Sequence, residues 1–114
     1  MSDECIFCQI AAGEMKADVV YETDDVLAFR DISPQAPVHV LVIPKKHIAT
    51  IAEAPTDAGL FDKLYAAAFE VAKNEGVFED GFRTVFNCHS KGGQVVFHMH
   101  MHVLGGRQMK GKLG

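Results

Sequence analysis

Five consecutive residues near the end of the chain, His98-Met99-His100-Met101-His102, alternate strictly between polar and apolar side chains. In a β-strand, residues two apart point to the same face, at a spacing of about 6.6 Å. The alternation therefore predicts a strand over Phe97–Leu104 that presents three imidazoles in register on one face. The other face then carries apolar side chains that can pack beneath a helix: Phe97, Met99, Met101 and Val103.

Three imidazoles on one face indicate chemistry rather than packing, because each buried imidazole must be hydrogen-bonded or charged at a cost in free energy. Two chemical interpretations fit. One is a three-histidine metal centre with an open position and an activated water. In the other, imidazole itself is a nucleophile or an acid and base, since its pKa lies near neutrality. The spacing alone does not distinguish them.

The rest of the chain combines short β-like segments with helical ones. An amphipathic helix is predicted over Asp57–Glu75, capped by Thr56-Asp57, and a shorter helix over Cys5–Ala12. Strands are predicted where β-branched and aromatic residues lie between turn signals: Val19–Thr23, Val26–Asp31, Val38–Ile43 and Arg83–Cys88. These elements indicate an α+β fold, with a five-stranded antiparallel sheet, one main helix and a short N-terminal helix.

Length and composition limit the kinds of partner. The 114 residues suit a single domain, residues 1–114, in which residues 105–114 form a loose tail. Eleven Lys and Arg against fifteen Asp and Glu give a net charge of −4, which argues against a nucleic acid polymer as partner. No apolar run approaches the roughly 18 residues of a membrane helix, and no signal peptide is visible. We therefore expect a cytoplasmic protein that does not bind a membrane.

The pair Cys5-Ile6-Phe7-Cys8 has the spacing of half a tetrahedral zinc site. No second pair exists, because Cys88 stands alone in a predicted strand as a small buried hydrophobe. Histidines would therefore have to complete a zinc site. The alternatives are two small residues in a helical turn, or a redox pair, for which the expected strand-then-helix context is missing.

The triad with its flanking residues, His98–Leu104, resembles the His-x-His-x-His-x-x signature of the histidine triad (HIT) superfamily of nucleotide hydrolases and transferases. Three further segments are similar to its Hint branch: Asp31–Pro37, Val42–Ile48 and Val103–Met109. The resemblance implies a HIT-like fold and attack of the middle histidine on the α-phosphate of a nucleoside 5′-phosphoramidate or similar ester. It also implies that water resolves the nucleotidyl-histidine and that no metal takes part in the chemistry.

The resemblance assigns catalytic roles to four histidines. His100 is the nucleophile, and its other ring nitrogen donates to the main-chain carbonyl of His98. His102 donates to the α-phosphate. His39 lies near the bridging or leaving group, where it suits general-acid work because a departing amine must be protonated.

The same resemblance implies a nucleotide site. Asn87 and the Gly92-Gly93-Gln94 loop contact the phosphate and leaving group, and Asp31 accepts from the ribose hydroxyls. Val95 stands where the family has a serine, so a hydroxyl contact is lost while the main-chain donor can stay. The Hint tail's tryptophan is also missing, since the chain has no Trp. The base lies in an apolar slot formed by Ile6, Phe7, Ile10, Phe29 and Ile32.

Two assemblies are expected from the resemblance. A structural zinc has a closed set of four ligands, Cys5, Cys8, His47 and His98. A homodimer joins two five-stranded sheets into one of ten strands, with the helices packed across the two-fold axis. The predicted main helix carries a wider apolar stripe than one sheet face needs, so a charge at Leu64 or Ala68 should disrupt the dimer. The stripe comprises Leu60, Phe61, Leu64, Tyr65, Ala68, Phe69 and Ala72.

Three functions are therefore weighed. The first is a purine nucleoside phosphoramidase acting on adenosine 5′-phosphoramidates or acyl-adenylates and releasing a nucleoside monophosphate. The second is a dinucleoside polyphosphate hydrolase. The third is a nucleotide-binding or protein-interaction module whose hydrolysis is incidental.

Overall fold

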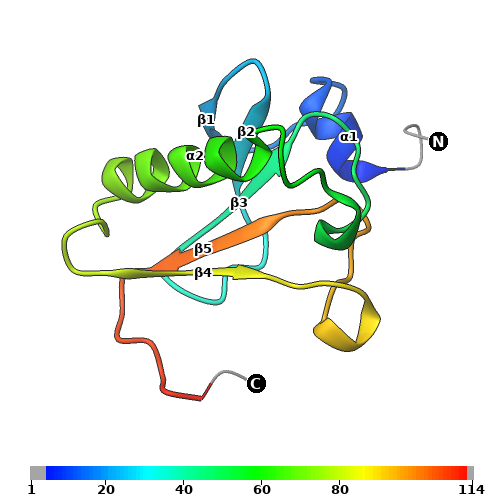
Figure 1. Cartoon of the computed structure of the whole chain (residues 1–114). Helices are drawn as coiled ribbons and strands as arrows, with labels where there is room; N and C mark the ends of the chain where they lie inside the picture. The colour runs from blue at the N-terminus through cyan, green and yellow to red at the C-terminus, as the bar shows by residue number, and fades with distance from the viewer. Residues whose placement is uncertain (1–4, 113–114) are drawn as a thin grey trace.

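The computed structural model describes residues 5–112 and contains one five-stranded antiparallel sheet with strand order β1-β2-β3-β5-β4 (Figure 1). The predicted α+β fold is confirmed. The strands are β1 (Val19–Glu22), β2 (Val26–Arg30), β3 (Val38–Pro44), β4 (Phe82–Phe86) and β5 (Met101–Gly105). The helices are α1 (Ile6–Ala11), α2 (Leu60–Asn74) and two single 3₁₀ turns, η2 (Ile51–Glu53) and η3 (Ser90–Gly92).

Both faces of the central strands are buried, which explains why β2 and β3 read as almost continuous apolar runs. On one face α2 packs against the strands, and Figure 1 shows this helix running across the sheet. The buried residues there include Val40, Val42, Met101 and Val103 from the strands and Leu64, Ala68 and Val71 from α2. On the opposite face, α1 packs against the same strands and forms a second buried cluster. It comprises Phe7 of α1 and the strand residues Leu27, Phe29, Leu41 and Ile43.

The main helix begins later than the sequence predicts. It starts at Leu60 rather than Asp57, because Gly59 holds a left-handed backbone (φ 76°) and its carbonyl accepts the N–H of Lys63. Thr56 and Asp57 therefore lie before the helix and do not cap it. Leu64 and Ala68 of α2 are fully buried in the core between the helix and the sheet, so the expectation that they form a dimer surface is wrong.

The histidine strand is shorter than predicted. β5 pairs with β3 only from Met101 onward, and the N–H of Met99 instead donates to the carbonyl of Ile48 at 2.7 Å. The alternation survives, because Met99 and Met101 lie in the α2 core. Phe97 does not join them and is 49% exposed. Gly105, expected to begin the tail, is instead the last residue of β5.

The N-terminal helix α1 is short: it begins at Ile6, and Cys5 is its N-cap. The Sγ of Cys5 accepts the N–H of Cys8 at 3.3 Å and so caps the first turn of α1. Within residues 5–112, no helix is long and apolar enough to cross a membrane.

Candidate functional site

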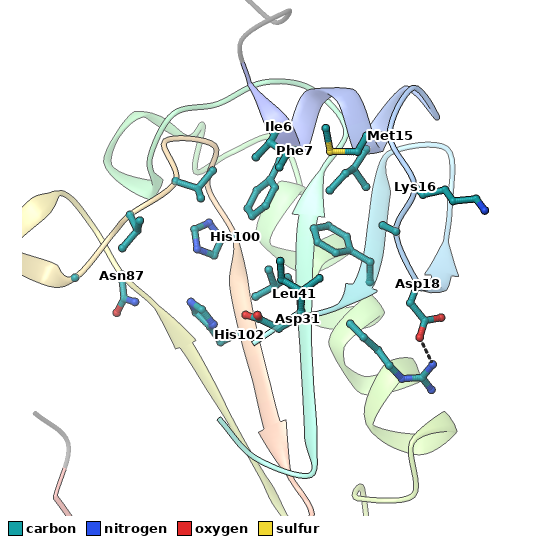
Figure 2. A pocket seen from close by; sticks show the side chains of 18 residues that line it. Ile6, Phe7, Met15, Lys16, Asp18, Asp31, Leu41, Asn87, His100 and His102 are labelled. Atoms are coloured by element: carbon teal, nitrogen blue, oxygen red, sulfur yellow. Dashed lines mark hydrogen bonds and ion pairs between the residues drawn. The ribbon is translucent and has the colours of Figure 1, made fainter. Parts of the chain in front are cut away.

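A cavity of about 730 Å³ opens on the sheet face that carries α1. One end carries two histidines, an asparagine and a carboxylate, whereas Lys16 and Asp18 lie at the opposite side, beyond a mostly apolar wall (Figure 2). Of the predicted nucleotide-binding residues, all but Gly92 and Gln94 line it: Ile6, Phe7, Ile10, Phe29, Asp31, Ile32, Asn87, Gly93, Val95, His100 and His102. Ile32 and Val95 are 98% and 82% exposed, so they border the mouth rather than form an enclosed slot.

His100 presents an unprotonated nitrogen to this cavity. Its Nδ1–H donates to the carbonyl of His98 at 2.9 Å, as the family resemblance implied. The lone pair of Nε2 is therefore free. Burial lowers the pKa of His100, and the edge of Phe7 packs against its ring at 5.2 Å between centroids. A neutral imidazole with a fixed tautomer is a competent nucleophile.

His102 lies beside His100, with ring centroids 5.0 Å apart. Its Nδ1 is 2.9 Å from Nε2 of His39. Burial, followed by the neighbouring His100 and His39, lowers the pKa of His102 to about 4, and burial also lowers the pKa of His39. Both rings are therefore neutral at neutral pH, and one N–H lies between the two nitrogens.

His39 lies next to His102 and is not among the residues that line the cavity. Its side chain is only 3% exposed and does not line the cavity, because β3 points it behind His102. His39 Nε2 is also 3.4 Å from the Oδ2 of Asp31. His39 therefore adjoins two residues that line the cavity, and its expected place near a leaving group stays a prediction.

Asp31 follows β2 and turns its carboxylate into the polar end of the cavity (Figure 2). Its Oδ1 accepts the N–H of Ser33 at 2.8 Å, which fixes the start of the proline-containing loop. This bond orients the Asp31 carboxylate, so that its oxygens can accept hydrogen bonds from a ligand in the cavity.

The main-chain N–H groups of the Gly92-Gly93-Gln94 loop, which was expected to contact the phosphate, already have partners. The N–H groups of Gly92, Gly93 and Gln94 are all used within the loop, on the carbonyls of His89 and Ser90. The Gln94 side chain is 4% exposed and also structural: it accepts from the N–H of His89 and donates to the carbonyl of Ala49. Gln94 therefore supports the loop, and Asn87 faces the cavity from beyond β4 (Figure 2).

Several lining residues were not predicted. Leu41 was detectable, since it follows His39 by two on the same strand and pairs with His102. The segment after α1 has no periodic signal, and only the tertiary structure brings it to the cavity. The unpredicted lining residues are Met15, Lys16, Ala17, Asp18, Arg30, Leu41 and Val96.

A second cluster lies beneath α1. Cys5, Cys8, His47 and His98 bring one ligand atom each within 4.8 Å of one another. The Sγ of Cys5 is 3.4 Å from Nδ1 of His98, and the Sγ of Cys8 is 3.2 Å from Nδ1 of His47. Tetrahedral zinc with ordinary bond lengths separates a sulfur and a nitrogen ligand by about 3.5 Å. The four residues thus fit a metal ion.

The chemistry of these ligands agrees with that fit. His98 Nε2–H donates to the carbonyl of Pro44 at 2.8 Å, which turns the lone pair of Nδ1 toward the thiols. Without a cation, burial and the adjacent Cys5 raise the pKa of the Cys8 thiol to about 11. A divalent cation would supply the charge that two neighbouring thiolates require.

Known proteins share both the sequence and the fold. A purine nucleoside phosphoramidase of Escherichia coli is 44% identical over 110 residues, covering 96% of this chain and 92% of that protein. A solved HIT family hydrolase of Legionella pneumophila gives a TM-score of 0.93 at 53% identity, covering 97% of this chain and all of that one. A zinc-bound histidine triad family protein of Mycobacterium smegmatis gives a TM-score of 0.79 at 32% identity, covering 94% of this chain and 78% of that one. The HIT domain family model matches residues 12–109, and the chain therefore belongs to the HIT family.

Proposed function

We propose that the chain is a hydrolase of purine nucleoside 5′-phosphoramidates that releases a nucleoside monophosphate. The observation that carries the proposal is the unprotonated Nε2 of His100 in a cavity that also has a large apolar wall. The E. coli relative that is a purine nucleoside phosphoramidase supports the choice of substrate.

The reaction runs in two displacements at phosphorus. Nε2 of His100 bonds to the α-phosphorus as the phosphorus–nitrogen bond breaks, and the departing nitrogen takes up one proton. Water then bonds to phosphorus as the bond to His100 breaks, and one proton is released. The hydrogen bond to the His98 carbonyl holds the positive charge that His100 acquires in the intermediate.

His102 is the donor in this scheme. It lines the cavity next to His100, so its ring N–H can donate to a phosphoryl oxygen on which charge develops. His39 acts through His102 and is a positioning residue, since it does not reach the cavity.

The remaining contacts follow the shape of the cavity. Asp31 accepts from the ribose hydroxyls, and the purine lies against Phe7, Phe29 and their apolar neighbours. Asn87 contacts the phosphate. The Gly93 and Gln94 amides are occupied within the loop, so we propose that the main-chain N–H of Val95, the next residue that lines the cavity, donates to the phosphate.

One set of assays tests the proposal. Turnover of adenosine 5′-phosphoramidate is measured beside guanosine 5′-phosphoramidate and diadenosine polyphosphates, each with and without a chelator. We expect the phosphoramidates to be preferred. Preference for the polyphosphates would identify a dinucleoside polyphosphate hydrolase, and tight monophosphate binding without turnover would identify a binding module; either result would overturn the proposal.

We propose that Cys5, Cys8, His47 and His98 hold a structural zinc ion. The zinc-bound relative and the tetrahedral spacing of the ligand atoms support this assignment. Four protein ligands leave no open position, so the ion would neutralise the thiolates and tie α1 to the segment before β5. A reducing compartment keeps such thiols available, which is consistent with a cytoplasmic location.

We propose a homodimer formed through α2 and β4. Aromatic rings continue from the helix to this edge strand, including Phe69 with Phe82 at 6.4 Å and Phe78 with Phe82 at 6.0 Å. Tyr65, Phe69 and Phe78 are each more than a third exposed, which is unfavourable for a monomer in water. Pairing of two β4 edges would cover them.

A further inference from the structure

Asp31 and His102 line the cavity, and with His39 they bring one potential ligand atom each within 4.8 Å of one another. Two histidines and a carboxylate can bind a metal, and they can equally form a hydrogen-bonded chain. The two arrangements require different protonation of His39. A metal needs Nε2 of His39 unprotonated, whereas a hydrogen bond from His39 to His102 needs a proton on that nitrogen.

The main chain of Gln35 decides between them. Its N–H donates to Nδ1 of His39 at 3.0 Å. A main-chain N–H is always a donor, so Nδ1 of His39 must be an acceptor and cannot carry a proton. A neutral His39 therefore carries its proton on Nε2, 2.9 Å from Nδ1 of His102.

We propose that the main-chain N–H of Gln35 is a positioning group that sets the tautomers of both His39 and His102. His39 Nε2–H donates to Nδ1 of His102, so the one proton of a neutral His102 is on Nε2. The two histidines in the cavity thus have opposite tautomers: His100 presents a lone pair, and His102 presents an N–H. The same bond to Gln35 disfavours a metal ion between Asp31, His39 and His102.

This arrangement matters for a phosphate ligand, and that consequence rests on the proposed function. With its proton on Nδ1 instead, His102 would present a second lone pair to the phosphoryl oxygens. No ring donor would then face the developing charge. The Gln35 N–H is linked to His102 through two successive hydrogen bonds. Its control of the His102 tautomer is therefore expected to change turnover more than binding.

The loop around Gln35 is held by contacts other than its bond to His39. The guanidinium of Arg107 donates to the Gln35 carbonyl at 3.1 Å, and the Gln35 amide side chain donates to the Ser33 carbonyl at 3.0 Å. Ala36, the next residue, is buried. The Gln35 N–H therefore has a fixed direction, which a tautomer lock requires.

A pair of substitutions at one position isolates the amide proton. Both variants lose the side-chain bond to the Ser33 carbonyl, but Gln35→Pro also removes the N–H, so Gln35→Ala serves as its control. Ring tautomers are read by nitrogen NMR of labelled histidine. We expect the protein and Gln35→Ala to hold His102 with its proton on Nε2, and Gln35→Pro to show a mixture of tautomers.

A second pair covers the case in which Gln35→Pro does not fold. His39→Gln keeps a donor near the position of Nε2, whereas His39→Leu has none. We expect His39→Leu to lose the single His102 tautomer and to lower kcat by about 10²-fold with KM changed far less, and His39→Gln to restore most of both.

Either of two NMR results would overturn the proposal: His102 protonated on Nδ1 in the unaltered protein, or an unchanged His102 tautomer in folded Gln35→Pro or His39→Leu. A second tightly bound zinc ion that persists in Cys8→Ser would also overturn it, because that ion needs Nε2 of His39 unprotonated. Failure of the proposed function looks different. In that case the NMR signals follow the expected pattern while the unaltered protein turns over no phosphoramidate.

Discussion

His98 serves two centres at once: its carbonyl accepts the Nδ1–H of His100 at 2.9 Å, and its ring Nδ1 lies 3.4 Å from the Sγ of Cys5. The side chain is fully buried, and its Nε2–H is held by the Pro44 carbonyl. The position of the proposed nucleophile and the geometry of the proposed zinc site therefore depend on the same residue.

Replacing the nucleophile should abolish turnover while leaving the fold intact. We expect His100→Ala to lower kcat by about 10³-fold or more, because neither neighbouring histidine can take its position. Nucleoside monophosphate binding, measured by calorimetry, should remain. His89→Asn is the matched control, since His89 is exposed and outside the cavity. Trapping of a nucleotidyl adduct on any residue other than His100 would disprove the assignment.

Zinc should be bound at one ion per chain and should stabilise the fold. Cys8→Ser is expected to lose the metal, as measured by elemental analysis, and to lower Tm by several degrees, since about 1 kcal/mol already shifts Tm by 4–8 °C at this size. Cys88→Ala should keep the metal, because Cys88 contacts Thr50 rather than the cluster. Loss of activity on chelation without any loss of stability would instead support a catalytic three-histidine metal centre.

Stability should decrease as the pH falls from about 6.5 to 4. The pKa of His102 is lowered from 6.5 to about 4, mainly by burial, so in this window the unfolded chain binds a proton that the folded chain does not. The free energy of unfolding therefore rises with pH across the window. The contribution of His102 to stability is lost as the pH falls. Urea unfolding at pH 7 and pH 5 measures the effect, and His102→Gln should reduce it. An equal pH dependence in that variant would contradict the assignment.

A charge on the exposed aromatic surface should separate the proposed dimer. Phe69 is 44% exposed and contacts Phe78 and Phe82, so Phe69→Lys places a charge in each half of a two-fold interface. Asn74→Lys, at an exposed position of the same helix, is the control. Light scattering should give a mass near 25 kDa for the control, about twice the 12.5 kDa chain, and a monomer for Phe69→Lys. A monomeric, fully active unaltered protein would exclude the dimer.

The sequence was sufficient where the information is local. Alternation over His98–His102 predicted which side chains face the α2 core, because the period of a strand is two. Apolar runs between turn residues located all five strands within a few residues. The family resemblance selected the residues around the cavity, since those residue types and spacings are specific.

Tertiary structure alone decided the direction of hydrogen bonds and the ends of elements. The sequence suggested a role for His39 near a leaving group, but only the tertiary structure shows that its ring lies between the Gln35 amide and His102. Gln94 looked like a phosphate contact, but its side-chain amide accepts from the His89 N–H and donates to the Ala49 carbonyl. These outcomes depend on donors and acceptors that are far apart in the chain or belong to the main chain. A residue's type and spacing do not specify which partner it meets, because that depends on how the whole sheet and its loops pack.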